Sequence, residues 1–292
     1  AAAQGKEGFR FTLHAPSVIP LLTYLDDRVV REQVWRAYNT RATSGEHDNG
    51  PLLQEIVALR AEKAALLGYK NFADLVLESR MAKTGAHARA FVDDLVTRTE
   101  AAFAAENQEL QAYRRELEGP SAADLQPWDV GYYAEKLRHA RFDFDEEELR
   151  PYFPVKSVLD GLFAIVQRLF DVRIEEAALP TWDPEVTTYR IVDPDGAHVA
   201  SFYADLFPRE NKRGGAWMNP LISAVDGGPQ LGLFCANNTK PTADKPALLT
   251  HREVETLFHE FGHLLHHSLS RVSVRSLAGT NVAWDFVELP SQ

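Results

Sequence analysis

The amino-acid sequence predicts a mainly helical protein with a small antiparallel β region. Through most of the first 170 residues, apolar residues recur at the spacing of helices that bury one face. Two segments rich in β-branched and aromatic residues, 187–192 and 198–203, then flank the turn sequence Asp-Pro-Asp-Gly, which is typical of a β-hairpin. From residue 251 onward the helical spacing returns.

Residues that start or stop helices bound the predicted helices. Pro16 and Pro20 lie near the start of the first helix, where a missing N–H costs little. Gly68 closes the second helix, and Gly119-Pro120 ends the long fourth one. The helices predicted before the β region span 17–41, 51–68, 71–79, 87–117, 128–141 and 154–170.

The β region is predicted to contain a further strand at 229–237, with the Gly-rich segment 213–215 as a loop before it. A change in composition near 172–185 is the one sign of a boundary. We therefore expect a helical region, 1–171, and a catalytic region, 172–292, that holds the small sheet and the last long helix. Because no linker separates them, one continuous domain is the alternative.

Composition excludes several classes of protein. The chain has 31 Lys and Arg against 42 Asp and Glu, a net charge of −11, which disfavours nucleic-acid binding. No window of 18 apolar residues predicts a membrane span. The single cysteine, Cys235, excludes an internal disulfide and fits a reducing compartment. The first residues lack the apolar core of a signal peptide, so we expect a cytoplasmic location.

One apolar helix carries the residues with metal chemistry. Its sequence His259-Glu260-Phe261-Gly262-His263 is an HExxH motif. Residues i and i+4 lie one above the other on a helix, so His259 and His263 can bind one metal ion. Glu260 can then reach a water on that metal, which is the arrangement of a zinc peptidase. The alternative is a cluster of core residues satisfied without metal.

A catalytic zinc site needs a third protein ligand. We predict a short helix after Gly279, with Thr280 as its N-cap, on which Asp285 and Glu288 share a face. Glu288 is the predicted third ligand. Asp285 could orient a ligand imidazole by accepting its other N–H, or it could simply stabilise the helix N-terminus.

Other candidates have weaker support. His251 is expected at the surface, and His266 and His267 are expected to have cationic or capping roles at the helix end. Cys235 is expected to be a small buried hydrophobic residue. The cations Arg209, Lys212 and Arg213 are either substrate contacts or, as the ordinary interpretation, part of a solvated loop.

The sequence resembles the thimet-oligopeptidase family of zinc metallopeptidases. The segments TLFHEFGHLLHHSLS and GTNVAWDFVELPSQ resemble the family's active-site signature. Segments such as LLGYKNFADLVLESRMA and FYADLFPRENKRGGAWMNP resemble other blocks, so the resemblance covers nearly the whole chain. The His pair after the motif and the VELPSQ ending are more similar to the bacterial oligopeptidase A branch than to the dipeptidyl carboxypeptidase branch.

The resemblance implies a zincin-type helical fold with two lobes around a channel that admits short peptides. It implies one Zn²⁺ per chain, bound by His259, His263 and Glu288, with Glu260 as the catalytic base. It also implies that the small β region borders the active site, where an edge strand could pair with an extended peptide. The expected partners are short peptide substrates, with no nucleic acid and no membrane.

One departure from the family bears on activity. Full-length members continue beyond the segment that matches Gln292, and there they supply substrate-binding Tyr and His residues, so the substrate-binding residues here are unknown. We therefore expect a fragment, a processed product or a short member. The alternative function is a zinc-containing peptide-binding fragment, or an inactive scaffold that needs a partner chain. A homodimer through the surface left by the missing part is possible. A helical domain without metal is the third alternative.

Overall fold

The computed structural model describes residues 11–13, 15–142, 146–225, 227–242 and 244–292. They form two compact units. Unit 1 comprises the described residues within 1–78 and 82–144, and unit 2 comprises Ser79–Met81 and the described residues within 145–292. The two are units of packing, and the domain division at residues 171 and 172 stays a prediction.

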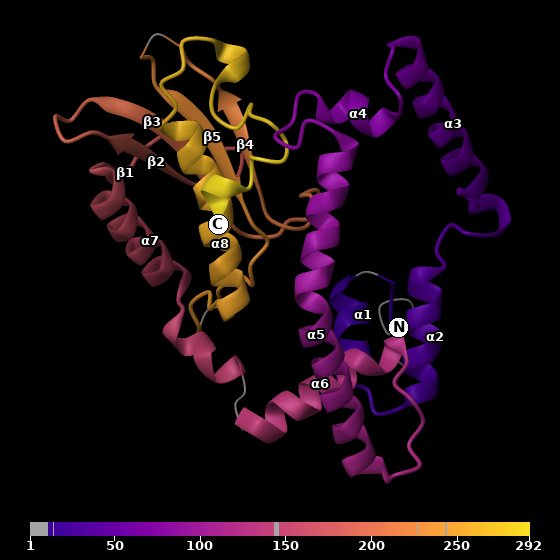
Figure 1. Ribbon diagram of the computed structural model, residues 1–292. Coiled ribbons are helices and arrows are strands. Elements are labelled where there is room, and N and C mark those ends of the chain that lie inside the picture. The colour runs from indigo at the N-terminus through magenta and orange to yellow at the C-terminus, as the bar shows by residue number, and fades with distance from the viewer. Residues whose placement is uncertain (1–10, 14, 143–145, 226, 243) are drawn as a thin grey trace. The chain divides into compact units, whose positions relative to one another are not determined.

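Unit 1 is helical throughout its regular structure, as the spacing of apolar residues predicts (Figure 1). The single helix predicted at 17–41 is wrong, because the chain breaks into two helices there. The Asp27 carboxylate accepts hydrogen bonds from the backbone N–H groups of Val29 and Val30 at 2.9 and 3.1 Å, and so starts a new helix. The elements are α1 (Ala15–Tyr24), α2 (Arg28–Asn39), η2 (Gly45–His47), α3 (Gly50–Leu66), α4 (Phe72–Leu77), α5 (Gly85–Glu118) and α6 (Pro127–Phe142).

Unit 2 combines two long helices with a five-stranded sheet of order β1-β2-β3-β5-β4. Three strand pairs are antiparallel, as expected, and β3 pairs with β5 in parallel, so the sheet is mixed. The elements are η3 (Glu146–Tyr152), α7 (Val155–Phe170), β1 (Arg173–Glu176), β2 (Thr187–Val192), β3 (His198–Asp205), β4 (Trp217–Ile222), β5 (Gln230–Cys235), α8 (His251–Ser268), η4 (Arg275–Leu277) and η5 (Leu289–Ser291).

The sequence did not predict the two edge strands. β1 is short and mostly charged, and β4 contains Pro220, which cannot donate a ladder hydrogen bond. Both strands lie at an edge of the sheet, where such residues are tolerated because one side of the strand needs no partner.

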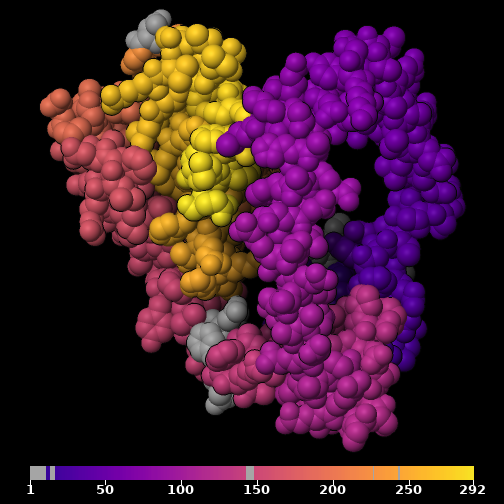
Figure 2. All heavy atoms as spheres, in the orientation of Figure 1, coloured from indigo at the N-terminus to yellow at the C-terminus, as the bar shows by residue number. Residues whose placement is uncertain are grey.

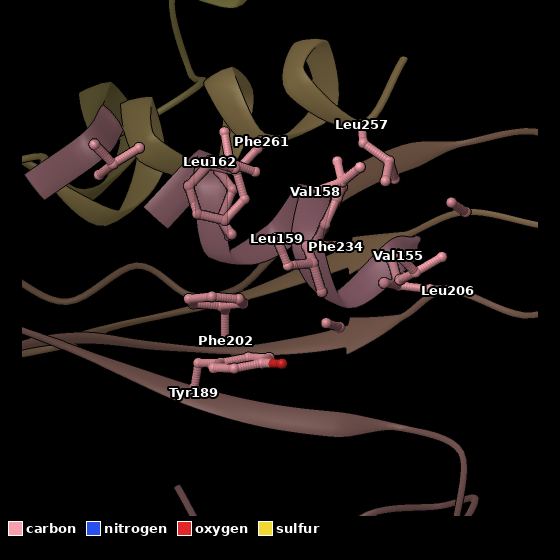
Figure 3. Packing of buried hydrophobic residues seen from close by; sticks show 14 of the residues in the cluster. Val155, Val158, Leu159, Leu162, Tyr189, Phe202, Leu206, Phe234, Leu257 and Phe261 are labelled. Atoms are coloured by element: carbon pink, nitrogen blue, oxygen red, sulfur yellow. The ribbon is translucent and has the colours of Figure 1, made fainter. Parts of the chain in front are cut away.

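An aromatic cluster joins the sheet to α7 and α8 (Figure 3). Phe261 of α8 is fully buried, and its ring centroid lies 5.6, 5.7 and 5.8 Å from those of Phe202, Phe234 and Phe163. The rings of Tyr189 and Phe202 stack at 5.1 Å on the sheet below. Phe261 is the central residue of the HExxH motif, so the core of unit 2 directly fixes the motif helix.

Candidate metal centre

The helix α8 begins with a complete capping box. The Thr250 hydroxyl accepts the Glu253 N–H at 3.1 Å, and the Glu253 carboxylate accepts the Thr250 N–H at 2.7 Å. These bonds satisfy backbone donors that the first turn of a helix leaves free. The start of α8 is thereby defined, which sets the direction in which the motif side chains project.

Three predicted ligands converge on one point. The Nε2 atoms of His259 and His263 lie 3.2 and 3.0 Å from the same carboxylate oxygen, Oε2 of Glu288. Their ligand atoms all lie within 4.8 Å of one another. The exposed fraction is 13% for the His263 side chain, 34% for His259 and 61% for Glu288, so the cluster is open to solvent on the Glu288 side. A catalytic metal site needs such an open side for water and substrate.

The spacing of these atoms fits a small divalent metal ion. Zinc bonds of about 2.0–2.1 Å at tetrahedral angles place neighbouring ligand atoms about 3.3 Å apart. The observed separations of 3.0 and 3.2 Å from Glu288 to the two imidazoles are close to this value. Two nitrogen donors and one carboxylate oxygen are also a ligand set that zinc accepts. The residues present therefore fit the metal that the motif predicts.

Glu260 lies beside this cluster on α8 and is partly buried. Burial raises the pKa of its carboxyl above the usual value, although the two imidazoles and a hydrogen bond from the Met218 N–H act in the opposite direction. Met218 belongs to the edge strand β4. A carboxyl with a raised pKa, next to a metal cluster, is equipped to accept and return a proton.

The segment that delivers Glu288 is not the predicted helix. Residues 284–288 form turns, followed by the short η5, and Thr280 caps no helix. At the start of the segment Gly279 has φ +59°, and a Cβ there would lie 2.7 Å from the His267 ring. Close packing on α8 thus overrides the local helical pattern, because the chain has to follow the surface of α8 to bring Glu288 back to the imidazoles.

Asp285 has a different observed contact from the predicted one. Its Oδ1 accepts the backbone N–H of Met81 at 2.9 Å, which ties the Glu288 segment to Ser79–Met81 inside unit 2. The buried Nδ1 of His263 has no hydrogen-bond partner, so Asp285 does not orient that imidazole. A role of Asp285 toward His259 stays a prediction.

The other histidines and the cysteine separate by burial. His251 is exposed, as expected, with Nδ1 3.7 Å from Glu255. His267 is fully buried, and its Nε2 lies 3.1 Å from the Leu231 carbonyl oxygen. Burial lowers the pKa of His266 and of His267, which favours the neutral imidazole over the cationic role for both; a capping role stays a prediction. Burial raises the pKa of Cys235 to about 11, which fits the expected hydrophobic residue.

A buried ionic cluster lies where the sequence suggested a solvated loop. The Arg209 guanidinium holds both oxygens of Asp205 at 2.7 and 2.6 Å. The Lys212 side chain is 4% exposed, and its ammonium lies 2.9 Å from the Asp205 carboxylate. It also donates to the backbone carbonyls of Asp205, Phe207 and Ala236. These two cations therefore anchor the loop that leads into β4, and the solvated-loop interpretation is wrong for them.

The fold and the cluster together define a class of protein. A mainly helical chain that joins two imidazoles of an HExxH helix to a distant carboxylate has the architecture of a zincin-type metallopeptidase. The sequence matches the profile described as peptidase family M3 over residues 21–292, so the chain belongs to this family of metallopeptidases.

Curated relatives agree with this membership. The chain is 42% identical to oligopeptidase A of Haemophilus influenzae, over 100% of this chain and 44% of the relative. It is 40% identical to oligopeptidase A of Escherichia coli, with the same coverage. It is 38% identical to dipeptidyl carboxypeptidase of Escherichia coli, over 94% of this chain and 40% of the relative. The chain therefore spans less than half the length of these relatives.

No helix among the described residues combines the length and the apolar character needed to cross a membrane.

Proposed function

We propose that this chain carries the active site of a zinc-dependent endopeptidase that hydrolyses short oligopeptides. One observation carries the proposal: the Nε2 atoms of His259 and His263 and the Glu288 carboxylate meet at one point, beside Glu260. The relatives named oligopeptidase A support short peptides as the substrate class. The setting that we propose is the cytoplasm.

The proposed chemistry divides between the metal and Glu260. His259, His263 and Glu288 would hold a zinc ion, which would supply Lewis-acid chemistry toward a peptide carbonyl and a water molecule. Glu260 accepts a proton from the attacking water as the new C–O bond forms. It then gives that proton to the amide nitrogen as the C–N bond breaks, so the carboxylate is regenerated. Partial burial of Glu260 favours this role because it raises the carboxyl's affinity for a proton.

The edge of the sheet offers a place for the substrate backbone. β4 pairs with β5 on one side and lies at the end of the strand order. An extended peptide can add to such an edge through backbone hydrogen bonds, which are independent of its side chains. Since Met218 of β4 lies beside Glu260, a peptide on this strand would lie next to the proposed base.

Cleavage of a quenched fluorescent peptide of about ten residues tests the proposal. We expect Glu260→Gln to reduce turnover by about 10²- to 10⁴-fold, the usual contribution of a general acid–base group, while one zinc per chain is retained. Glu255→Gln is the matched control, because Glu255 lies on the same helix with 66% of its side chain exposed and should leave turnover unchanged. Glu288→Ala should lose zinc.

Two outcomes would decide against the proposal. Full turnover by Glu260→Gln would remove Glu260 as the base. Absence of turnover in zinc-loaded wild type would favour the alternative function, a zinc-containing peptide-binding chain. This alternative is based on how little of the relatives the chain matches, 44% of the one from Haemophilus influenzae. Residues with which a relative binds its substrates need not all lie in the matched part.

A further inference from the structure

We propose that Ser291 and Gly262 are positioning residues for the Glu288 carboxylate, and that together they set the metal affinity of the site. The inference rests on the proposed function, because it assumes that Glu288 is a metal ligand. It concerns two residues that make no contact with the metal themselves. Ser291 limits the rotation of the Glu288 carboxylate. Gly262 allows the backbone turn that carries Glu288 to lie close to α8.

The Ser291 side chain lies within hydrogen-bond distance of both ends of Glu288. Its hydroxyl oxygen lies 2.7 Å from the Glu288 backbone carbonyl oxygen and 3.2 Å from Oε2 of the same residue, and its single hydrogen is shared between these two acceptors. That Oε2 is the oxygen on which both imidazoles converge. Ser291 is 7% exposed, so water competes little for its hydroxyl. The contact restricts the rotation of a carboxylate that is otherwise 61% exposed and would be free to swing into solvent.

Gly262 allows the Glu288 turn to approach α8. A Cβ built at this position would lie 2.7 Å from the Cα of Ser291 and 2.8 Å from the carbonyl oxygen of Pro290. Real Cβ atoms do not approach backbone atoms so closely, so the turn would have to move. Glycine is a poor helix former in the middle of α8, and alanine would favour the helix itself. The close approach gives a physical reason for glycine at this position of the motif.

The two contacts act on the same short segment. Figure 2 shows the last residues, in bright yellow, directly against the atoms of α8. If Gly262→Ala displaced the Glu288 turn from α8, the carboxylate would no longer lie about 3 Å from both imidazoles, even with the Ser291 hydroxyl present. If Ser291→Ala removed the hydroxyl, the turn would keep its place but the carboxylate would be free to rotate. We therefore expect Gly262→Ala to have the larger effect and Ser291→Ala the smaller one.

Zinc affinity, measured by competition with a chelating dye, tests the proposal in the folded 292-residue chain. We expect Ser291→Ala to weaken zinc binding about 10-fold and Gly262→Ala up to about 100-fold, the range found when a group behind a metal ligand is removed. Ser291→Thr keeps the hydroxyl and should restore affinity to near wild type. With Co²⁺ in place of zinc, the visible absorption of both weakened variants should change, because the ligand geometry changes.

Matched controls separate positioning from stability. Ser268→Ala removes a buried hydroxyl of α8 that has no hydrogen-bond partner, and Gly161→Ala adds a methyl group in α7 where nothing lies within 4 Å. Both should leave zinc affinity and the Co²⁺ spectrum unchanged. Melting of the metal-free proteins checks that each variant is folded. Should Gly262→Ala fail to fold, the pair Ser291→Ala and Ser291→Thr still decides the positioning role of Ser291.

The failures can be told apart. If wild type binds no zinc, the proposed metal site itself is wrong. If wild type binds zinc tightly and Ser291→Ala matches it in affinity and spectrum, the metal site stands and the positioning role of Ser291 is wrong. Equal affinity for Gly262→Ala and Gly161→Ala would remove the role of Gly262.

Discussion

Unit 1 and unit 2 bury different kinds of side chain at their centres. In unit 1 the Asp129 carboxylate is fully buried and accepts hydrogen bonds from the guanidinium groups of Arg28, Arg31 and Arg114 at 2.8–3.1 Å. These residues come from α2, α5 and α6, so one carboxylate links three helices. In unit 2 the motif helix α8 packs on the aromatic cluster around Phe261, while the buried Asp205 carboxylate pairs with Arg209 and Lys212 at the end of β3.

Both units leave large apolar side chains exposed, among them Leu53, Val57, Phe91 and Phe103 on α3 and α5 of unit 1 and Leu169, Trp284 and Leu289 of unit 2. Hydrophobic burial is non-directional, whereas a buried carboxylate with three guanidinium partners accepts few arrangements. The comparison teaches that the helix with the candidate metal ligands packs on an apolar core within unit 2. Unit 1 instead links three of its helices through directional ionic bonds, and we predict that the two units can be perturbed separately.

The largest expected effect is in the core of unit 2. Phe261→Ala should lower the free energy of unfolding of unit 2 by about 3–5 kcal/mol, because it removes a fully buried ring that contacts three others. Zinc affinity should fall with it, since Phe261 fixes the motif helix. Hydrogen exchange measured peptide by peptide should rise across β5 and α8 while α6 is unchanged. Phe103→Ala is the control, because Phe103 is exposed. Equal losses of unfolding free energy in both variants would refute the role of the apolar core in holding the motif helix.

The matching test in unit 1 is Asp129→Asn. It leaves Arg31 and Arg114, whose side chains are 1% and 5% exposed, without their buried counterion. Removing one partner of a buried ion pair costs about 3 kcal/mol or more, so α2, α5 and α6 should lose protection from hydrogen exchange. Zinc affinity should stay the same. Asp93→Asn, in an exposed pair on α5, should change little. A loss of zinc binding in Asp129→Asn would contradict the independence of the two units.

On acidification, the two units should begin to lose stability at different pH values. Burial by itself would raise the pKa of Asp129, but its hydrogen bonds from Arg28, the Gln126 N–H and Arg31 outweigh burial and hold the pKa below the usual value. Asp129 therefore takes up a proton more readily in the unfolded state than in the folded state. The stability that its ion pairs contribute is lost only as pH falls below about 4. Burial lowers the pKa of His266 and of His267, so unit 2 should lose stability already as pH falls below about 6.5.

Peptide-resolved hydrogen exchange of metal-free protein between pH 7 and pH 3.5, corrected for intrinsic exchange rates, measures this difference. His267→Gln should flatten the response of unit 2 between pH 6.5 and 5. If both units began to lose protection at the same pH in wild type, the assignment of the acid response to Asp129 in unit 1 and to the buried histidines in unit 2 would be wrong.

Local sequence signals predicted much of the fold, and tertiary contacts account for the rest. The helix predicted at 51–68 is α3, because Pro51 and Gly68 mark its ends in the sequence itself. The break at Asp27 was missed because the apolar spacing continues across it, and only the cap shows the interruption. β4 was missed because Pro220 is unfavourable in a strand, unless the strand lies at an edge. The mainly helical fold class is confirmed.

The candidate site shows the same division. The spacing of His259 and His263 follows from helix geometry alone, and the structure brings both to Glu288. Glu288 was chosen on the assumption of a helix that does not form, yet the structure places it beside both imidazoles; its role as a ligand stays a prediction. The burial of His267 could not be predicted, because it depends on Gly232 and Gly279, which come close to its ring from distant parts of the chain.

The smallest expected effect concerns the ionic anchor of unit 2, which is the closest counterpart there to the Asp129 cluster. Lys212→Met keeps the length of the side chain but removes the donor from the carbonyls of Phe207 and Ala236, while the Asp205 carbonyl keeps the Ala236 N–H at 3.0 Å. Leaving buried acceptors unpaired costs about 1–3 kcal/mol, less than the loss of Asp129 because Asp205 keeps its bidentate contact with Arg209. Hydrogen exchange should rise in the loop after β3 and in β4.

Lys240→Met is the control, because it breaks an exposed pair with Glu185 and should cost about 1 kcal/mol at most. Equal losses from the two lysine variants would show that the Lys212 anchor adds no more stability than a surface ion pair, and that unit 2 depends on its aromatic core alone.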